Sequence, residues 1–215
     1  MFSSYFSSLP YIIAVVSIPD PELALETSKA LMDGGVRAIE LALRNPAALE
    51  SIGKIRVQVP QMIVGAGTVL RREQVQQVID SGASFAVSPG FNPLVAETAI
   101  AKKFPFAPGI ATPSDIEGVL QAGLTTMKVF PAKYLGGIQY MKSIYTPYAH
   151  LKIRFIPLGG VEAEDISQYL KEEMIISIGG SWIAPAKDIE NRDWKKIREK
   201  AAAAVALVKQ GGGSI

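Results

Sequence analysis

The sequence is poor in the residues that build thiol and metal chemistry. It contains no cysteine and a single histidine, His150. Without cysteine, disulfides, a thiolate nucleophile and cysteine-ligated metals are excluded. With one histidine, a histidine-based metal site or a general-base histidine is not expected either. His150 falls between two predicted elements, and we expect it in a surface loop rather than in a catalytic site.

Long apolar runs and a large charge of one sign are also missing. The apolar run at residues 11–16 has only the length of a strand, and the first ten residues carry no basic region. We therefore predict neither a signal peptide nor a membrane span, and expect a cytoplasmic protein. The net charge of +2 does not predict nucleic-acid binding. We interpret the charge run at residues 192–198 as the solvated face of a helix.

What is present is the composition of one globular domain. The chain has 215 residues, of which 48% are hydrophobic and 20% charged. This length is compatible with a single (β/α) barrel. We predict one domain at residues 1–210 and a flexible glycine-rich tail at residues 211–215.

Short apolar runs alternate with helical patterns along the whole chain. The runs predicted as strands are residues 11–17, 36–43, 62–64, 84–87, 104–107, 125–130, 152–156 and 174–178. Parallel strands joined by helices form either a doubly wound sheet or an eight-fold barrel. Eight pairs in one domain favour a single-domain α/β fold of the TIM (β/α)8 type, in which every strand is buried.

The predicted strand at residues 125–130 contains one lysine, Lys128, among apolar neighbours. On its own this strand could lie at an edge with the lysine in solvent. In the barrel interior, an amine among apolar groups gives up its proton more readily and becomes a nucleophile for a ketone. Glu40 lies on the second strand, where Ile39, Leu41 and Leu43 take the opposite face. We predict that Glu40 points inward and moves protons for Lys128, the alternative being an ion pair that only satisfies two charges.

Other candidates follow at the carboxyl ends of the strands, where barrel active sites lie. Arg44 and the Thr68 hydroxyl could bind a carboxylate; the alternative for Gly65-Ala66-Gly67-Thr68 is a tight turn with a helix cap. Two glycine-rich turns, Gly159-Gly160 and Gly179-Gly180-Ser181, could bind a phosphate through backbone N–H groups and helix N-termini, or could be plain loops. Neither has the spacing of a nucleotide-binding motif.

Together these groups suit a 2-keto acid that carries a phosphate at its far end. The amine condenses with the ketone, and the iminium withdraws electrons so that the carbon–carbon bond two atoms away can break. The acid group then moves the protons. The sequence therefore predicts a small-molecule enzyme of the carbon–carbon lyase type, with Lys128 and Glu40 as its catalytic groups.

A set of segments in this order resembles class I 2-keto-3-deoxy-6-phosphogluconate (KDPG) aldolases, a family that also includes 4-hydroxy-2-oxoglutarate aldolases. The resemblance runs in register from residue 9 to residue 186. The segments that carry it are Glu40-Leu41-Ala42-Leu43-Arg44, Gly65-Ala66-Gly67-Thr68-Val69-Leu70, Ser88-Pro89-Gly90, Pro108-Gly109-Ile110-Ala111-Thr112-Pro113-Ser114, Lys128-Val129-Phe130-Pro131-Ala132 and Gly179-Gly180-Ser181-Trp182.

The resemblance implies a homotrimeric TIM barrel that cleaves KDPG to pyruvate and glyceraldehyde 3-phosphate with no metal or other cofactor. It implies that Lys128 forms the Schiff base and that Glu40 is the acid/base. The remaining expected contacts with substrate are Arg44 and Thr68 with the carboxylate, Phe130 with the pyruvyl carbons, Gly159, Gly160 and Ser181 with the phosphate, and Pro89 and Gly180 beside them.

Four positions depart from the family pattern. Ala42 and Asn45 stand where threonine is common, Asp115 replaces a glutamate, and Leu158 replaces a threonine whose hydroxyl would lie near the substrate. None of them is the lysine or the glutamate, so the reaction class is retained and the substrate's far end is left open. The alternatives are an aldolase for 4-hydroxy-2-oxoglutarate or for the galactonate epimer, and a non-catalytic barrel that binds a phosphorylated keto acid.

Overall fold

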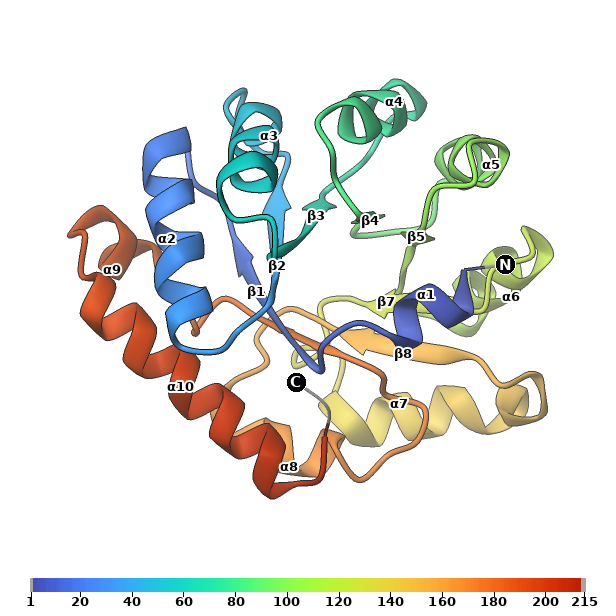
Figure 1. Cartoon of the computed structure of the whole chain (residues 1–215). Coiled ribbons are helices and arrows are strands. Elements are labelled where there is room, and N and C mark those ends of the chain that lie inside the picture. The colour runs from blue at the N-terminus through green and yellow to red at the C-terminus, as the bar shows by residue number, and fades with distance from the viewer. Residues whose placement is uncertain (1, 214–215) are drawn as a thin grey trace.

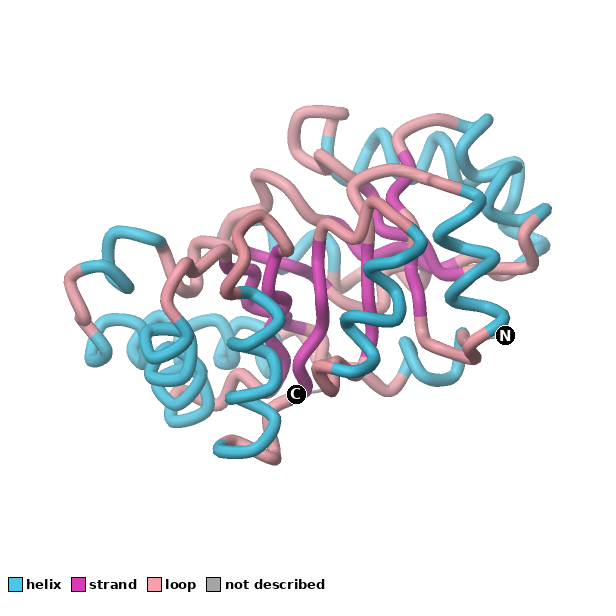
Figure 2. The backbone as a smooth tube through the Cα atoms, turned by 90° about the horizontal axis from the view of Figure 1, so that it is seen from above, coloured by secondary structure: helices cyan, strands magenta, loops and turns pink. Residues whose placement is uncertain are grey.

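The computed structural model describes residues 2–213, and within them the predicted barrel is confirmed. Its strands are all parallel and short. They are β1 (Ile12–Val16), β2 (Ala38–Ala42), β3 (Ile63–Gly67), β4 (Phe85–Val87), β5 (Phe106–Ala107), β6 (Gly109–Ile110), β7 (Thr126–Val129), β8 (Arg154–Pro157) and β9 (Ile178–Gly180). Figure 2 shows the strands side by side in the middle of the molecule, with helices outside them.

Hydrogen bonds carry the sheet around the barrel in the order β5-β4-β3-β2-β1-β9 and β6-β7-β8. β5 and β6 are two halves of the fifth barrel strand, separated by Pro108, which has no N–H to donate. Between β8 and β9 the gap is bridged by Phe155 and Ile175, and the Phe155 N–H donates to the Met174 carbonyl. Every strand is therefore an interior strand, which is what the burial of Lys128 requires.

Helices cover the outside of the strands (Figure 1). They are α2 (Pro21–Asp33), α3 (Ala48–Gln58), α4 (Arg72–Asp80), α5 (Pro93–Ala101), α6 (Pro113–Gln121), α7 (Gly137–Tyr145), α8 (Ile166–Tyr169), α9 (Ala186–Glu190) and α10 (Trp194–Gln210), with 3-10 segments η1 (Thr146–Leu151) and η2 (Ala163–Asp165). Local sequence starts several of them. Asp20 accepts hydrogen bonds from the backbone N–H groups of Glu22 and Leu23, so it caps α2 ahead of Pro21.

Alternation along β2 determines which side chains enter the barrel. Ile39 and Leu41 pack in the cluster between strands and helices, whereas Ala38 belongs to the smaller cluster inside the barrel. Glu40 therefore points inward, as its spacing predicts.

A helix that the sequence analysis did not predict, α1 (Ser3–Ser7), closes the amino-terminal end of the barrel. Phe6 is fully buried, and its ring meets Phe85 edge-to-face at a centroid distance of 6.1 Å. Five residues are too few to show a helical period. With this end filled by aromatic rings, the opposite end is the one left for a site.

Other differences from the predictions are local. Gly65 and Gly67 lie inside β3 rather than in a turn, because the strand continues past the apolar run. His150 is exposed, in η1. The backbone N–H groups of Gly211, Gly212 and Gly213 bond to the last turns of α10. Ser214 and Ile215 lie outside the described residues, so the flexible tail stays a prediction.

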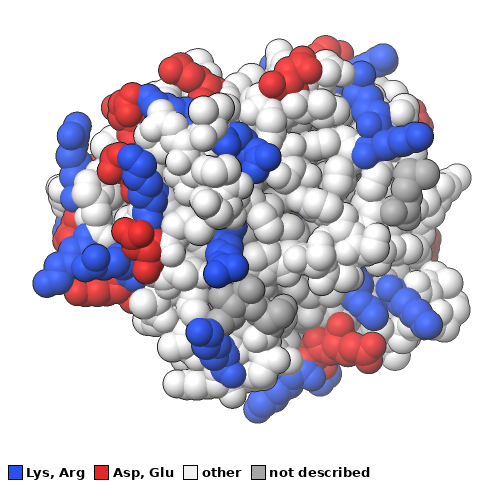
Figure 3. All heavy atoms as spheres, viewed as in Figure 1, with Lys and Arg blue, Asp and Glu red and all other residues white. Residues whose placement is uncertain are grey.

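The surface mixes charges of both signs. In Figure 3, Lys and Arg alternate with Asp and Glu over α2, α9 and α10. Ion pairs in this region include Lys29–Glu26 and Lys196–Asp188. Among residues 2–213, no helix is long and apolar enough to cross a membrane.

Candidate active site

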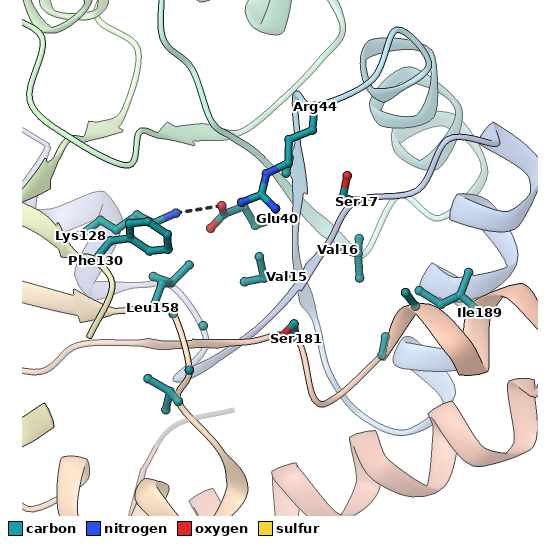
Figure 4. Close-up of a pocket in the computed structure, with 17 residues that line it drawn as sticks. Val15, Val16, Ser17, Glu40, Arg44, Lys128, Phe130, Leu158, Ser181 and Ile189 are labelled. Carbon is teal, nitrogen blue, oxygen red and sulfur yellow. Dashed lines mark hydrogen bonds and ion pairs between the residues drawn. The ribbon is translucent and has the colours of Figure 1, made fainter. Parts of the chain in front are cut away.

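Lys128 and Glu40 form a buried ion pair inside the barrel. Lys128 Nζ donates to Glu40 Oε1 at 3.1 Å, and the two side chains are 6% and 3% exposed. They come from β7 and β2, 88 residues apart in the sequence. Figure 4 shows the two side chains pointing toward each other across the site. The inward orientation predicted for both residues is present in the structure.

Phe130 continues the inward face of the chain at Lys128. Its ring centroid lies 5.3 Å from Lys128 Nζ, which is within the range of a cation–π contact. Phe130 therefore offers an apolar wall beside the nucleophile, as a group packed against pyruvyl carbons would.

A cavity of about 270 Å³ opens above the ion pair at the carboxyl ends of the strands. Among the described residues that line it, the only charged ones are Glu40, Arg44 and Lys128. Arg44 follows β2 and extends its guanidinium into the same space as Glu40 (Figure 4). An amine, a carboxylate and a guanidinium that share one cavity can condense with a ketone, move a proton and bind a carboxylate.

The other end of the cavity is lined by glycine, serine and apolar groups. Gly159 and Gly160 turn the chain after β8 with φ of 93° and 75°, a left-handed conformation that side chains rarely adopt. Ser181 follows β9 and lines the same cavity. The segments after these turns, α8 and α9, have only four and five residues, so the predicted contribution of a helix dipole is small. Backbone N–H groups and the Ser181 hydroxyl remain as donors for an anion.

Three predicted site residues do not line this cavity. Thr68 follows β3 at the same end of the barrel and is half-buried, with φ of 60°. Pro89 follows β4, and its backbone passes close to Gly109: a Cβ on Gly109 would lie 2.2 Å from the Pro89 carbonyl group. A Cβ on Gly180 would lie 2.4 Å from Trp182 Nε1, so Gly180 faces the indole, and Gly179 lines the cavity instead.

The four departures from the family pattern have different surroundings. Leu158 is 2% exposed and packs over Gly179. A Cβ on Gly179 would lie 2.5 Å from Leu158 Cγ. Leu158 therefore forms an apolar floor of the cavity. Ala42 also lines the cavity, and Asn45 Oδ1 is buried with no hydrogen-bond partner among residues 2–213.

Asp115, the fourth departure, belongs to a helix cap. Its carboxylate accepts from the backbone N–H groups of Ala111 and Thr112, at the start of α6. Burial alone would raise the pKa of Asp115, but these hydrogen bonds outweigh it and hold that pKa below its usual value. The departure at 115 therefore concerns the helix rather than the cavity.

Sequence reasoning missed two parts of the cavity wall. Ser17 follows β1 and lines the cavity; its place at the end of the first predicted strand was the available signal. Ala186 and Ile189 of α9 line the far side. α9 was not separated from α10 in the sequence, because its pattern is too short to stand out. Among residues 2–213, no cluster of metal-ligating side chains is present.

The family model for KDPG and KHG aldolases (KHG being 4-hydroxy-2-oxoglutarate) matches residues 7–200. The chain is 39% identical to a 2-dehydro-3-deoxy-phosphogluconate aldolase of Dickeya dadantii, over 91% of both chains. It is 37% identical to a KHG/KDPG aldolase of Escherichia coli K12, over 92% of both chains.

Solved structures agree. The KDPG aldolase of Zymomonas mobilis with 3-phosphoglycerate superposes with a TM-score of 0.89 at 35% identity, over 96% of this chain and 97% of that one. The Legionella pneumophila enzyme, with pyruvate captured as a covalent carbinolamine, gives 0.87 at 32% identity, over 93% and 96%. A cage designed by fusing symmetric oligomeric domains gives 0.80 at 28% identity, over 95% of this chain and 74% of that one.

Proposed function

We propose that this chain is a Schiff-base aldolase that cleaves KDPG to pyruvate and glyceraldehyde 3-phosphate. The premise is that the chain belongs to the KDPG and KHG aldolase family. The observation that carries the proposal is the buried contact between Lys128 and Glu40 beneath a cavity with a single guanidinium. A binding protein has no need of a buried amine nucleophile, so a non-catalytic barrel is disfavoured.

The proposed reaction assigns a step to each group. Lys128 Nζ adds to the C2 ketone, and the carbinolamine loses water to give an iminium. The C3–C4 bond then breaks: its electron pair moves toward the iminium as the C4 hydroxyl loses its proton and becomes the aldehyde. The resulting enamine takes a proton at C3, and hydrolysis releases pyruvate. Glu40 lies 3.1 Å from the amine and moves these protons.

For the substrate, the two ends of the cavity support different parts of the proposal. Arg44 binds the keto-acid carboxylate, whereas the Gly159-Gly160 turn and Ser181 bind the phosphate. Thr68, Pro89 and Gly180 remain candidate contacts, next to the cavity rather than in its wall. The second candidate is 4-hydroxy-2-oxoglutarate, which carries no phosphate. We retain 4-hydroxy-2-oxoglutarate as a candidate because Leu158 forms an apolar floor, which supplies no hydroxyl for a phosphorylated chain. The galactonate epimer differs only in stereochemistry and belongs to the same panel.

Trapping with borohydride tests the proposal. Incubation with pyruvate and borohydride is expected to add one three-carbon adduct, which peptide mass spectrometry finds on Lys128. An adduct on Lys133, which is exposed, or no adduct at all would contradict the mechanism. Pyruvate release from phosphorylated and unphosphorylated 2-keto acids then identifies the preferred substrate.

We also propose that the chain forms a homotrimer. Leu70, in the loop after β3, and Leu94, in the first turn of α5, are 49% and 54% exposed, and Asn92 donates a hydrogen bond to the Leu70 carbonyl. These two exposed leucines, on a loop and on the start of a helix that a hydrogen bond joins, provide an apolar surface for another copy. Light scattering is expected to give three times the mass of the chain, and an L70D/L94D variant is expected to give a smaller species. A monomeric parent protein would contradict the proposal.

A further inference from the structure

The contact between Glu40 and Lys128 depends on an empty position in β3. In the paired register of β2 and β3, Glu40 lies beside Gly65 and Ala42 lies beside Gly67. The Glu40 carboxylate nevertheless lies at Gly67, because a Cβ built there would be 2.0 Å from Oε1 and 2.8 Å from Cδ. The side chain therefore rises along the barrel toward the cavity and covers the bare backbone of Gly67.

A side chain at position 67 would displace the Glu40 oxygen that contacts Lys128. Oε1, which a Cβ at 67 would meet, is the oxygen that accepts from Lys128 Nζ at 3.1 Å. Cγ of Glu40 would also be 2.9 Å from the added Cβ. A real Cβ tolerates none of these distances, so the whole end of the Glu40 side chain would have to move away.

The backbone at Gly67 does not itself demand glycine. Gly67 is the last residue of β3, and its φ lies outside the left-handed region. The requirement is therefore one of space, and that space is taken by Glu40 alone among the nearest atoms. Gly65 differs: a Cβ there would lie 2.2 Å from the buried Phe85 ring, so Gly65 serves the packing of the barrel.

We propose that Gly67 is a positioning residue: because it has no side chain, the Glu40 carboxylate can lie over it, at the height of Lys128. The proposal rests on the aldolase function above and adds a residue to its machinery. Gly67 touches no substrate in this role and acts only through Glu40.

The test is the G67A variant, assayed for KDPG cleavage. We expect kcat to fall about 100-fold, as for a displaced acid/base group, with KM changed less than about threefold. The pH dependence of kcat should also shift, because the proton-moving group has left the amine. G53A is the matched control: a Cβ at that position of α3 would meet only Ser81 O, at 3.6 Å. It should keep wild-type kcat.

A double-mutant cycle separates positioning from general damage. In the E40Q background the side chain is the same size but cannot exchange protons, so G67A should cost kcat less than about threefold there. An equal loss in both backgrounds would overturn the proposal, as would full kcat in G67A alone.

A G67A variant that does not fold and a wild-type protein that forms no adduct each have a defined consequence. If G67A does not fold, E40A/G67A replaces it: recovery of the fold supports a clash with the Glu40 side chain, and failure to recover it overturns the proposal. If wild-type protein gives no pyruvate adduct on Lys128, the aldolase function fails. An adduct in wild type together with unchanged G67A kinetics defeats the role of Gly67 alone.

Discussion

The keto-acid end of the cavity and its distal end are built from different groups. At the keto-acid end, Lys128 and Glu40 come from opposite strands and are held by a hydrogen bond inside the barrel, with Arg44 above them. The distal end has the Gly159-Gly160 turn, the Ser181 hydroxyl and the apolar side chain of Ile189, whereas Leu158 lies beside Phe130 on the side of Lys128. In Figure 4, Ser181 and Ile189 lie across the cavity from Lys128.

Because of this difference, the groups proposed for the reaction lie at one end of the cavity, and the groups proposed to select the substrate lie at the other. Burying two charges costs several kcal/mol per ion, so each must have its partner in place, and few substitutions preserve the pair. Backbone N–H groups and one hydroxyl bind an anion whatever the neighbouring side chains are. Under the proposed function, we therefore expect the keto-acid end to determine the reaction, and the distal end to tolerate a change of substrate with little damage to the fold.

The largest effect is expected from K128R. Arginine keeps the positive charge and can pair with Glu40, but it does not lose its proton and forms no Schiff base. We expect kcat to fall at least about a thousandfold, with no pyruvate adduct after borohydride. Circular dichroism should show an intact barrel. An adduct elsewhere with appreciable turnover would mean that the keto-acid end is misassigned.

The next effect is expected from E40Q. Glutamine preserves the shape of the side chain but cannot exchange protons, so kcat should fall about 10²–10⁴-fold. The Lys128 adduct with pyruvate should still form. Stopped-flow absorbance and mass spectrometry measure the two separately. Wild-type turnover in this variant would remove Glu40 from the proton steps.

Sequence reasoning went furthest at the keto-acid end, for a physical reason. Alternation along 36–43 places Glu40 inward because its neighbours are apolar, and an interior strand leaves Lys128 no solvent. The barrel itself follows from eight repeats of one pattern. The pattern does not predict individual atomic contacts. The position of the Glu40 carboxylate over Gly67, for example, depends on the register of β2 and β3.

The distal end was less predictable. Glycine turns look alike whether they bind an anion or only reverse the chain, so nothing in the sequence distinguished Gly179, which lines the cavity, from Gly180, which faces Trp182. α1 and α9 have five residues each and show no period. Ser17 follows a strand that carried no other polar signal.

A smaller effect, confined to one end, is expected from S181A. In the proposed function the Ser181 hydroxyl donates to the phosphate, so its loss should raise KM for KDPG about tenfold. KM for unphosphorylated 4-hydroxy-2-oxoglutarate should stay unchanged. R44A is the comparison at the other end, because it should raise KM for both substrates. Equal effects of S181A on the two substrates would show that the distal end does not bind the phosphate.

The smallest effect is expected from D188N, which concerns how the distal end is held. Asp188 of α9 is buried, and Lys200 and Lys196 of α10 donate to its carboxylate, so the helix that carries Ile189 is tied to α10. The Lys200 hydrogen bond is the main cause that holds the pKa of Asp188 below its usual value, against the opposing effect of burial.

A lowered pKa in the folded state means that this interaction stabilises the protein above the unfolded-state value, near pH 4, and is lost as pH falls through the folded-state value. D188N should therefore lower the free energy of unfolding at pH 7 by about 1 kcal/mol, since the two lysines are partly exposed. Urea unfolding at pH 7 and at pH 3 measures this, and the difference from wild type should shrink at pH 3. The kcat of the variant should stay near wild type, because the Asp188 carboxylate pairs with Lys196 and Lys200 of α10 and is not among the described residues that line the cavity. A large loss of kcat would show that the keto-acid end also depends on α9.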